Sequence, residues 1–126
     1  MAENVATRGL TDAVRRYFDL MYDCDVTKFA QVFRSTAQLH GFREGEMTVW
    51  DAASYKDILS KRQSPKSQGA PREEEVLLID FASATQALVK VRVRIGAPRF
   101  VDYLTFHRFG EDWLITSKAY HLEGSA

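Results

Sequence analysis

The chain has 126 residues, of which 45% are hydrophobic, and this length suits one domain (residues 1–126) with a single core. Its 17 Lys and Arg residues balance 17 Asp and Glu residues, which excludes a bulk electrostatic attraction to nucleic acids or acidic membranes. A single Cys excludes an internal disulfide, and three His without ligand-type spacing argue against a metal site. No apolar run reaches the length of a membrane span or a secretion signal, so we expect a soluble cytoplasmic protein without metal or cofactor.

Two helices are predicted at the N-terminal end. In the first, apolar side chains recur at helical spacing, with polar side chains on the opposite side: Leu10, Val14, Tyr17, Phe18 and Met21. Asp25 is a suitable N-cap for a second, shorter helix. That helix contains Val26, Phe29, Ala30 and Phe33, and the two helices are expected to form a helical hairpin.

Residues 37–50 change to the two-residue period of β-structure around the sequence Glu44-Gly45-Glu46. This pattern predicts a strand, a turn and a short strand that ends near Trp50. Asp51 then caps a third helix with Ala52, Tyr55, Ile58 and Leu59 on its apolar side. Residues 62–73, RQSPKSQGAPRE, have no period and are expected to form an exposed loop.

Four strands are predicted in the second half of the chain, at residues 74–82, 86–95, 99–109 and 112–122. The breaks between them are too short for anything but antiparallel neighbours. The predicted class is therefore α+β, with three N-terminal helices packed on one face of a curved antiparallel sheet.

Asp102 is predicted to face inward with the apolar residues of its sheet. A two-residue loop at Gly110-Glu111 would place Asp102 opposite Ala119, with His121 as its diagonal neighbour on the same face. A three-residue loop, the less favoured alternative, would keep Asp102 inside and move His121 to the outer face. The preceding hairpin indicates the same inward face, with Val93 opposite Asp102. A buried carboxylate needs a partner, and the candidates are His121, His40, Tyr17 and Tyr55.

The outer face of the predicted sheet is rich in basic and aromatic side chains: Lys90, Arg92, Arg94, Tyr103, His107, Lys118 and Tyr120. A homodimer interface on this convex face is the first interpretation, because Tyr and Arg are favoured at interfaces. A solvated face is the second interpretation. A surface for single-stranded nucleic acid is the last, and we expect no such partner.

The order of the predicted elements resembles the cone-shaped nuclear transport factor 2-like, or cystatin-like, fold. SnoaL-like polyketide cyclases, scytalone dehydratase and ketosteroid isomerase share this fold. The last hairpin is similar to that of the Putative lumazine-binding branch, with the pattern F-x-DYL, a turn, W-x-I and K-x-x-H. The matching residues are Phe100, Asp102, Tyr103, Leu104, Trp113, Ile115, Lys118 and His121. The turn differs, because this chain has Gly110-Glu111 where the branch often has Asp-Gly.

A cone-shaped pocket between the helices and the concave face would be lined by Tyr17, Met21, Phe33, Tyr55, Leu59, Val93 and Trp113, although each could equally be a core residue. Three functions remain open. The first is the binding of a small apolar or aromatic ring compound. The second is a lyase or isomerase reaction in which Asp102 and His121 are the catalytic acid–base pair. The third is a dimeric interaction module without a ligand.

Overall fold

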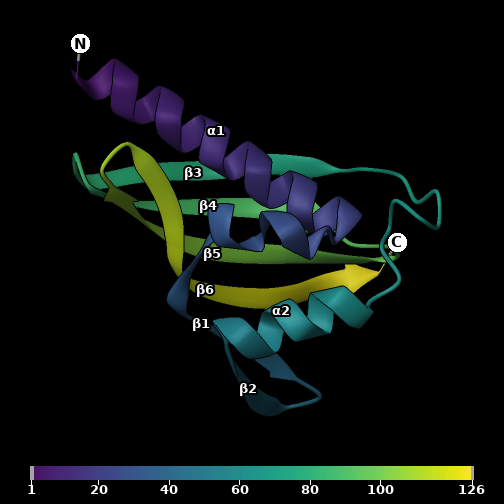
Figure 1. The fold of residues 1–126 in the computed structure, drawn as a ribbon. Helices are drawn as coiled ribbons and strands as arrows, with labels where there is room; N and C mark the ends of the chain where they lie inside the picture. Colours follow the sequence, from purple (N-terminus) through teal and green to yellow (C-terminus); the bar gives the residue numbers. More distant parts are fainter. Residues whose placement is uncertain (1, 126) are drawn as a thin grey trace.

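In the computed structural model, which describes the backbone of residues 2–125, three helical segments cover one face of a curved six-stranded sheet (Figure 1). The strand order is β2-β1-β6-β5-β4-β3. The elements in chain order are α1 (Ala2–Asp23), η1 (Val26–Gln31), β1 (Phe33–Arg43), β2 (Glu46–Asp51), α2 (Ala52–Lys61), β3 (Glu74–Ser83), β4 (Gln86–Arg94), β5 (Pro98–Phe109) and β6 (Asp112–Ser125). Among the described residues, no helix combines the length and apolar character that a membrane crossing requires.

Helix α1 lies across the concave face of the sheet (Figure 1) and presents the apolar side predicted from its spacing. Leu10, Val14, Tyr17 and Met21 are all buried. The helix ends where Cys24 adopts a positive φ of 53°, a conformation usual for the residue that follows a helix C-terminus. The covering of the concave face by α1 therefore follows directly from the apolar period of the sequence.

The second helical segment is shorter than predicted and is a 3-10 helix, η1. Asp25 caps it as expected, since its side chain accepts a hydrogen bond from the Thr27 backbone N–H. Phe33 does not belong to this helix but begins β1, so the predicted extent of the second helix is wrong. Phe33 instead stacks on Phe29 with ring centroids 4.9 Å apart, and this packing stabilises the early change to extended backbone.

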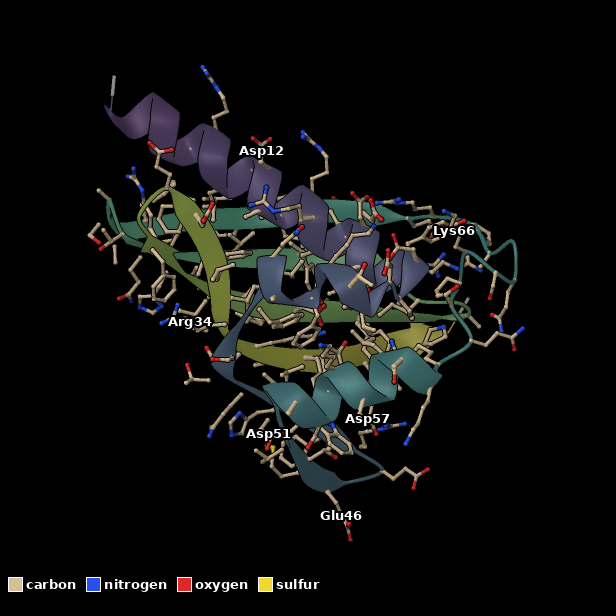
Figure 2. The ribbon with its side chains drawn as sticks, viewed as in Figure 1. Asp12, Arg34, Glu46, Asp51, Asp57 and Lys66 are labelled. Carbon is tan, nitrogen blue, oxygen red and sulfur yellow. The ribbon has the colours of Figure 1, made fainter. Side chains whose placement is uncertain are left out.

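Strands β1 and β2 form the predicted hairpin, with a turn in which Glu44 and Gly45 both have positive φ. Figure 2 shows Glu46 at the outer end of this hairpin and Asp51 at the start of α2. Strand β1 pairs in parallel with β6. The sheet is therefore mixed, and the prediction of a purely antiparallel sheet is wrong. The β1–β2 hairpin lies beside β6, the last strand of the meander, and not beside β3, the first.

Strands β3 to β6 form the predicted antiparallel meander. In the β4–β5 hairpin, Val91 lies opposite Asp102, two residues from the predicted partner Val93. The backbone bond from Ile95 N–H to Pro98 C=O closes a shorter loop than expected. A shift of two residues preserves the side-chain alternation, so the inward face of these strands is the predicted one.

Acidic side chains pair with the arginines of the outer face. The guanidinium of Arg92 contacts both carboxylate oxygens of Glu123, at 2.8 and 3.0 Å, and one oxygen of Glu75 at 3.1 Å. Arg94 and Arg99 both contact Glu73. These pairs partly neutralise the basic face, which reduces its attraction for phosphate groups.

Candidate functional site

A β-bulge in β6 decides which side chains reach the interior. Pairing begins as predicted with Phe109 opposite Asp112 and Phe106 opposite Ile115. Thr105 then pairs with Ser117, so Thr116 is an extra residue. Its hydroxyl oxygen lies 2.6 Å from Nδ1 of His107, a contact that holds Thr116 at the bulge. Figure 1 shows that β6 bends sharply along its length.

From Thr105 to Phe100, the β6 partners are shifted by one residue from the favoured prediction. Asp102 lies opposite Tyr120 and Leu104 lies opposite Lys118. His121 is exposed, opposite Val101 on the outer face, so its predicted pairing with Asp102 is wrong. Lys118 and Tyr120 face inward, so their predicted place on the outer face is also wrong. His121 therefore has the outer position of the less favoured alternative, although a bulge rather than a longer loop puts it there.

Asp102 is buried, as predicted, with 1% of its surface exposed. The hydroxyl of Tyr17 donates a hydrogen bond to Asp102 Oδ2 at 2.5 Å. Lys118 Nζ lies 3.9 Å from the same oxygen and 3.3 Å from the Tyr55 hydroxyl oxygen. The Met21 sulfur lies 3.4 Å from the Tyr55 hydroxyl oxygen and 3.9 Å from Lys118 Nζ. The carboxylate, the amine and the two phenols thus form one polar cluster inside the apolar core.

Burial dominates the electrostatics of this cluster. It raises the pKa of Tyr17 well above the usual value, and the adjacent Asp102 charge raises it further. Tyr17 therefore stays protonated, and its hydroxyl donates a hydrogen bond to the carboxylate oxygen of Asp102. The Lys118 ammonium lies 5.1 Å from the ring centroid of Tyr17 and 5.0 Å from that of Tyr55, distances at which ring faces attract cations.

A cavity of about 520 Å³ adjoins the cluster and lies between α2, the β1–β2 hairpin, the start of β5 and the second half of β6. The beginning of the 62–73 loop closes one side. Large apolar side chains supply much of its wall: Phe42, Trp50, Ile58, Ile95, Phe100 and Leu122. The polar lining includes Tyr55, Arg62, Asp102, Lys118 and Tyr120. The volume lies within the range of about 300 to 1,000 Å³ that is usual for small-molecule sites.

Three buried side-chain atoms of the described residues have no hydrogen-bond partner: Arg62 Nη1, Asp102 Oδ1 and Tyr120 Oη. All three residues line the cavity. Buried polar atoms in native proteins are nearly always paired. These unpaired polar atoms are thus grouped around one cavity.

The predicted site residues separate into two groups. Asp102 and Tyr55 line the cavity, and Tyr17 and Met21 contact the polar cluster. Phe33, Leu59, Val93 and Trp113 are buried in the core and are not among the cavity-lining residues.

His40 is exposed on β1. No group of three or more potential metal ligands occurs in the described part of the chain. Burial raises the pKa of the lone Cys24 thiol, which disfavours the reactive thiolate.

Arg62 and Trp50 were not predicted as site residues, and Lys118 and Tyr120 were predicted on the wrong face. A signal for the last two was present in β6. The apolar residues Trp113 and Ile115 occupy odd positions, whereas Tyr120 and Leu122 occupy even ones. Such a change of phase within one strand indicates a bulge. No comparable signal marks Arg62, whose position depends on how the loop returns over the cavity.

Comparison with solved structures identifies the class of fold. The chain has a TM-score of 0.82 to a nuclear transport factor 2-like protein of unknown function from Silicibacter pomeroyi, at 20% identity and covering 98% of this chain and 100% of that chain. A ketosteroid isomerase-like protein from Erwinia carotovora atroseptica has a TM-score of 0.71, 10% identity and coverage of 93% and 95%. A cystatin-like fold protein from Burkholderia xenovorans also has a TM-score of 0.71, with 12% identity and coverage of 98% and 95%. The fold is therefore the nuclear transport factor 2-like, or cystatin-like, cone.

Within this class the chain belongs to the Putative lumazine-binding family, whose model matches residues 6–121. No curated protein sequence matches the chain. The family expected from the last hairpin is thus confirmed, and the match extends over most of the chain.

Proposed function

We propose that the chain is a small-molecule-binding protein whose cavity holds a planar, largely apolar ring compound. The observation that carries this proposal is Asp102 Oδ1, a buried carboxylate oxygen without a donor at the cavity wall. Leaving such an atom unpaired costs about 1–3 kcal/mol. A ligand N–H or O–H group that donates to this oxygen would recover that cost, and the ligand would be oriented by it.

The rest of the lining supports the same ligand class. Trp50 and Phe100 offer flat apolar surfaces to a ring. The Tyr120 hydroxyl and the Arg62 guanidinium can donate to a carbonyl or similar acceptor. A ring that carries a donor and an acceptor is therefore a better match than a simple hydrocarbon.

A second candidate function is proton transfer of the lyase or isomerase kind. The observation that favours it is the bond from the Tyr17 hydroxyl to Asp102, which leaves the second carboxylate oxygen at the cavity. Asp102 would accept a proton from a bound ring, and the Lys118 ammonium or Tyr55 hydroxyl would stabilise the developing negative charge. His121 has no part in this version, because it lies on the other face of the sheet.

Asp102→Asn distinguishes the two functions in parallel assays on ring ketones, enols and pterin-like compounds. Calorimetry measures affinity, and solvent deuterium exchange into the bound compound measures proton transfer. The binding proposal predicts saturable binding that Asp102→Asn weakens about tenfold, without exchange in either protein. Exchange that is lost in the variant while affinity is kept would favour the enzyme.

The matched control is Asp112→Asn, which removes an exposed carboxylate at the β5–β6 turn. It should leave affinity and exchange unchanged. Binding that Asp102→Asn and Asp112→Asn affect equally would contradict a role for Asp102 at the site. If none of the compounds binds to the wild-type chain, the third function, an interaction module without a ligand, takes precedence.

We also propose that the chain forms a homodimer through the outer face of the sheet. Tyr103 is 44% exposed at the middle of this face, and Lys90 lies 5.4 Å from its ring centroid. Exposed Tyr beside balanced ion pairs suits a contact between identical surfaces.

A further inference from the structure

Lys118 occupies a position in the sheet that favours an apolar residue. It lies between Leu39 of β1 and Leu104 of β5, and it is only 5% exposed. Burying a charged amine costs several kcal/mol unless strong partners compensate. A lysine at this position therefore needs either a strong ion pair or a chemical role.

The ion pair at Lys118 is a weak one. Among the described residues its one carboxylate neighbour, Asp102 Oδ2, is 3.9 Å away, beyond hydrogen-bond distance, and already accepts the hydrogen bond from Tyr17. The Tyr55 hydroxyl at 3.3 Å is the one oxygen of the described residues that accepts a hydrogen bond from the amine. The other contacts are the Met21 sulfur and two aromatic ring faces. A primary amine in such surroundings, at the wall of a cavity, has the setting in which lysines condense with carbonyl groups.

We propose that Lys118 forms a Schiff base with the aldehyde or ketone group of a small ring compound held in the cavity. This inference rests on the cavity assigned above as the binding site, and it adds a covalent step to it. The apolar wall formed by Trp50, Ile58 and Phe100 would hold the ring, while the carbonyl carbon faces the amine.

The step balances without an oxidant or reductant. The ammonium first gives one proton to solvent or to the Asp102 carboxylate. The neutral amine then adds to the carbonyl carbon, and the carbonyl oxygen takes a proton from the Tyr55 hydroxyl. The positively charged nitrogen gives a proton to the Tyr55 phenolate, which leaves a neutral carbinolamine. Loss of the carbinolamine hydroxyl as water, with a returned proton, leaves a protonated imine. Overall the ammonium and the carbonyl compound become an iminium ion and one water molecule.

Reductive trapping tests the proposal on the wild-type chain. The protein is incubated with benzaldehyde and sodium cyanoborohydride, which converts an imine to a stable secondary amine, and the modified lysines are located by peptide mass spectrometry. Lys61 is the internal control, because its side chain is 76% exposed on α2. We expect Lys118 to be trapped at least about tenfold faster than Lys61. Labelling of Lys118 at or below the rate of Lys61 overturns the proposal.

Lys118→Arg keeps the positive charge and cannot form an imine. The fast component of labelling should disappear in this variant, while labelling of Lys61 is unchanged. A fast component that persists would also overturn the proposal. The comparison within the wild-type chain remains decisive if the variant does not fold.

Benzyl alcohol separates this proposal from the binding function, because it has the same ring but no carbonyl group. Its binding is followed by calorimetry. Benzyl alcohol that binds to a protein whose Lys118 is not trapped contradicts the covalent step alone. Selective trapping of Lys118 without affinity for benzyl alcohol supports the covalent step and contradicts noncovalent ring binding.

Discussion

Tyr17→Phe tests whether the polar cluster contributes to stability as its geometry indicates. The substitution removes one hydroxyl oxygen from a side chain that is 0% exposed and leaves the ring packing in place. It also removes the hydrogen bond that Asp102 accepts in the folded chain, at 2.5 Å. The carboxylate is then left with Lys118 at 3.9 Å as its nearest charged neighbour.

Hydrogen bonds to charged groups contribute about 1.5–3 kcal/mol. We therefore expect the free energy of unfolding to fall by about 2 kcal/mol. In a domain of 126 residues this corresponds to a decrease in Tm of about 8 °C. Urea unfolding followed by circular dichroism measures the change, with an unaltered m-value as evidence that the unfolded state is unchanged.

Tyr22→Phe is the matched control. The Tyr22 hydroxyl donates to the neutral carbonyl of Ala70 at 3.0 Å in a half-buried setting, so its removal should cost only about 0.5–1.5 kcal/mol. If Tyr17→Phe destabilises the chain by no more than Tyr22→Phe, the carboxylate does not depend on Tyr17 and the description of the cluster fails.

Three further results are expected. Because the pKa of Tyr17 is raised in the folded state, stability should fall as pH rises above about 10, where only the unfolded chain loses this proton; Tyr17→Phe should lack up to about 1.4 kcal/mol per pH unit of that slope in alkaline urea titrations. Gly41→Ala would place a Cβ atom 2.3 Å from the Tyr120 ring, so it should lower the unfolding free energy by about 1–3 kcal/mol and weaken ligand binding, and Tyr120→Ala in the same chain should restore part of the stability. Tyr103→Glu should convert the proposed dimer to monomer in light scattering, whereas Lys66→Glu in the exposed loop should not, and a monomeric wild-type chain at high concentration would contradict the dimer.

The sequence predicted most of the fold because its local patterns are strong. The apolar period of α1, the caps Asp25 and Asp51, and the alternating runs of the last four strands each correspond to an observed element. The extent of the second helix was not predictable in this way, because the packing of Phe33 on Phe29 stabilises Phe33 in β1. The parallel pairing of β1 with β6 depends on contacts between distant parts of the chain, and local pattern contains no information about them.

The candidate site was predicted only in part, and a single residue explains why the side chains of β6 were assigned to the wrong faces. Asp102 lies on β5, which carries no extra residue, so the alternation of its own strand was enough to place it inside. Lys118 and Tyr120 lie after Thr116 in β6, where the predicted alternation is reversed. Uniform pairing is the natural assumption for a hairpin with a two-residue loop, and it first fails at Thr116, where a side-chain contact to His107 stabilises an extra residue.

The same bulge explains why a site can exist at this place in an otherwise apolar face. Without it, Ser117, Ala119 and His121 would face inward in place of Lys118 and Tyr120. With it, Lys118 reaches the Tyr55 hydroxyl and the Tyr120 ring packs against Gly41, which has no side chain to obstruct it. One extra residue in β6 therefore brings an amine and a phenol to the carboxylate of β5, and the cavity acquires donors opposite its acceptor. A bulge in one strand can therefore change which side chains face a cavity while the rest of the sheet keeps its pairing.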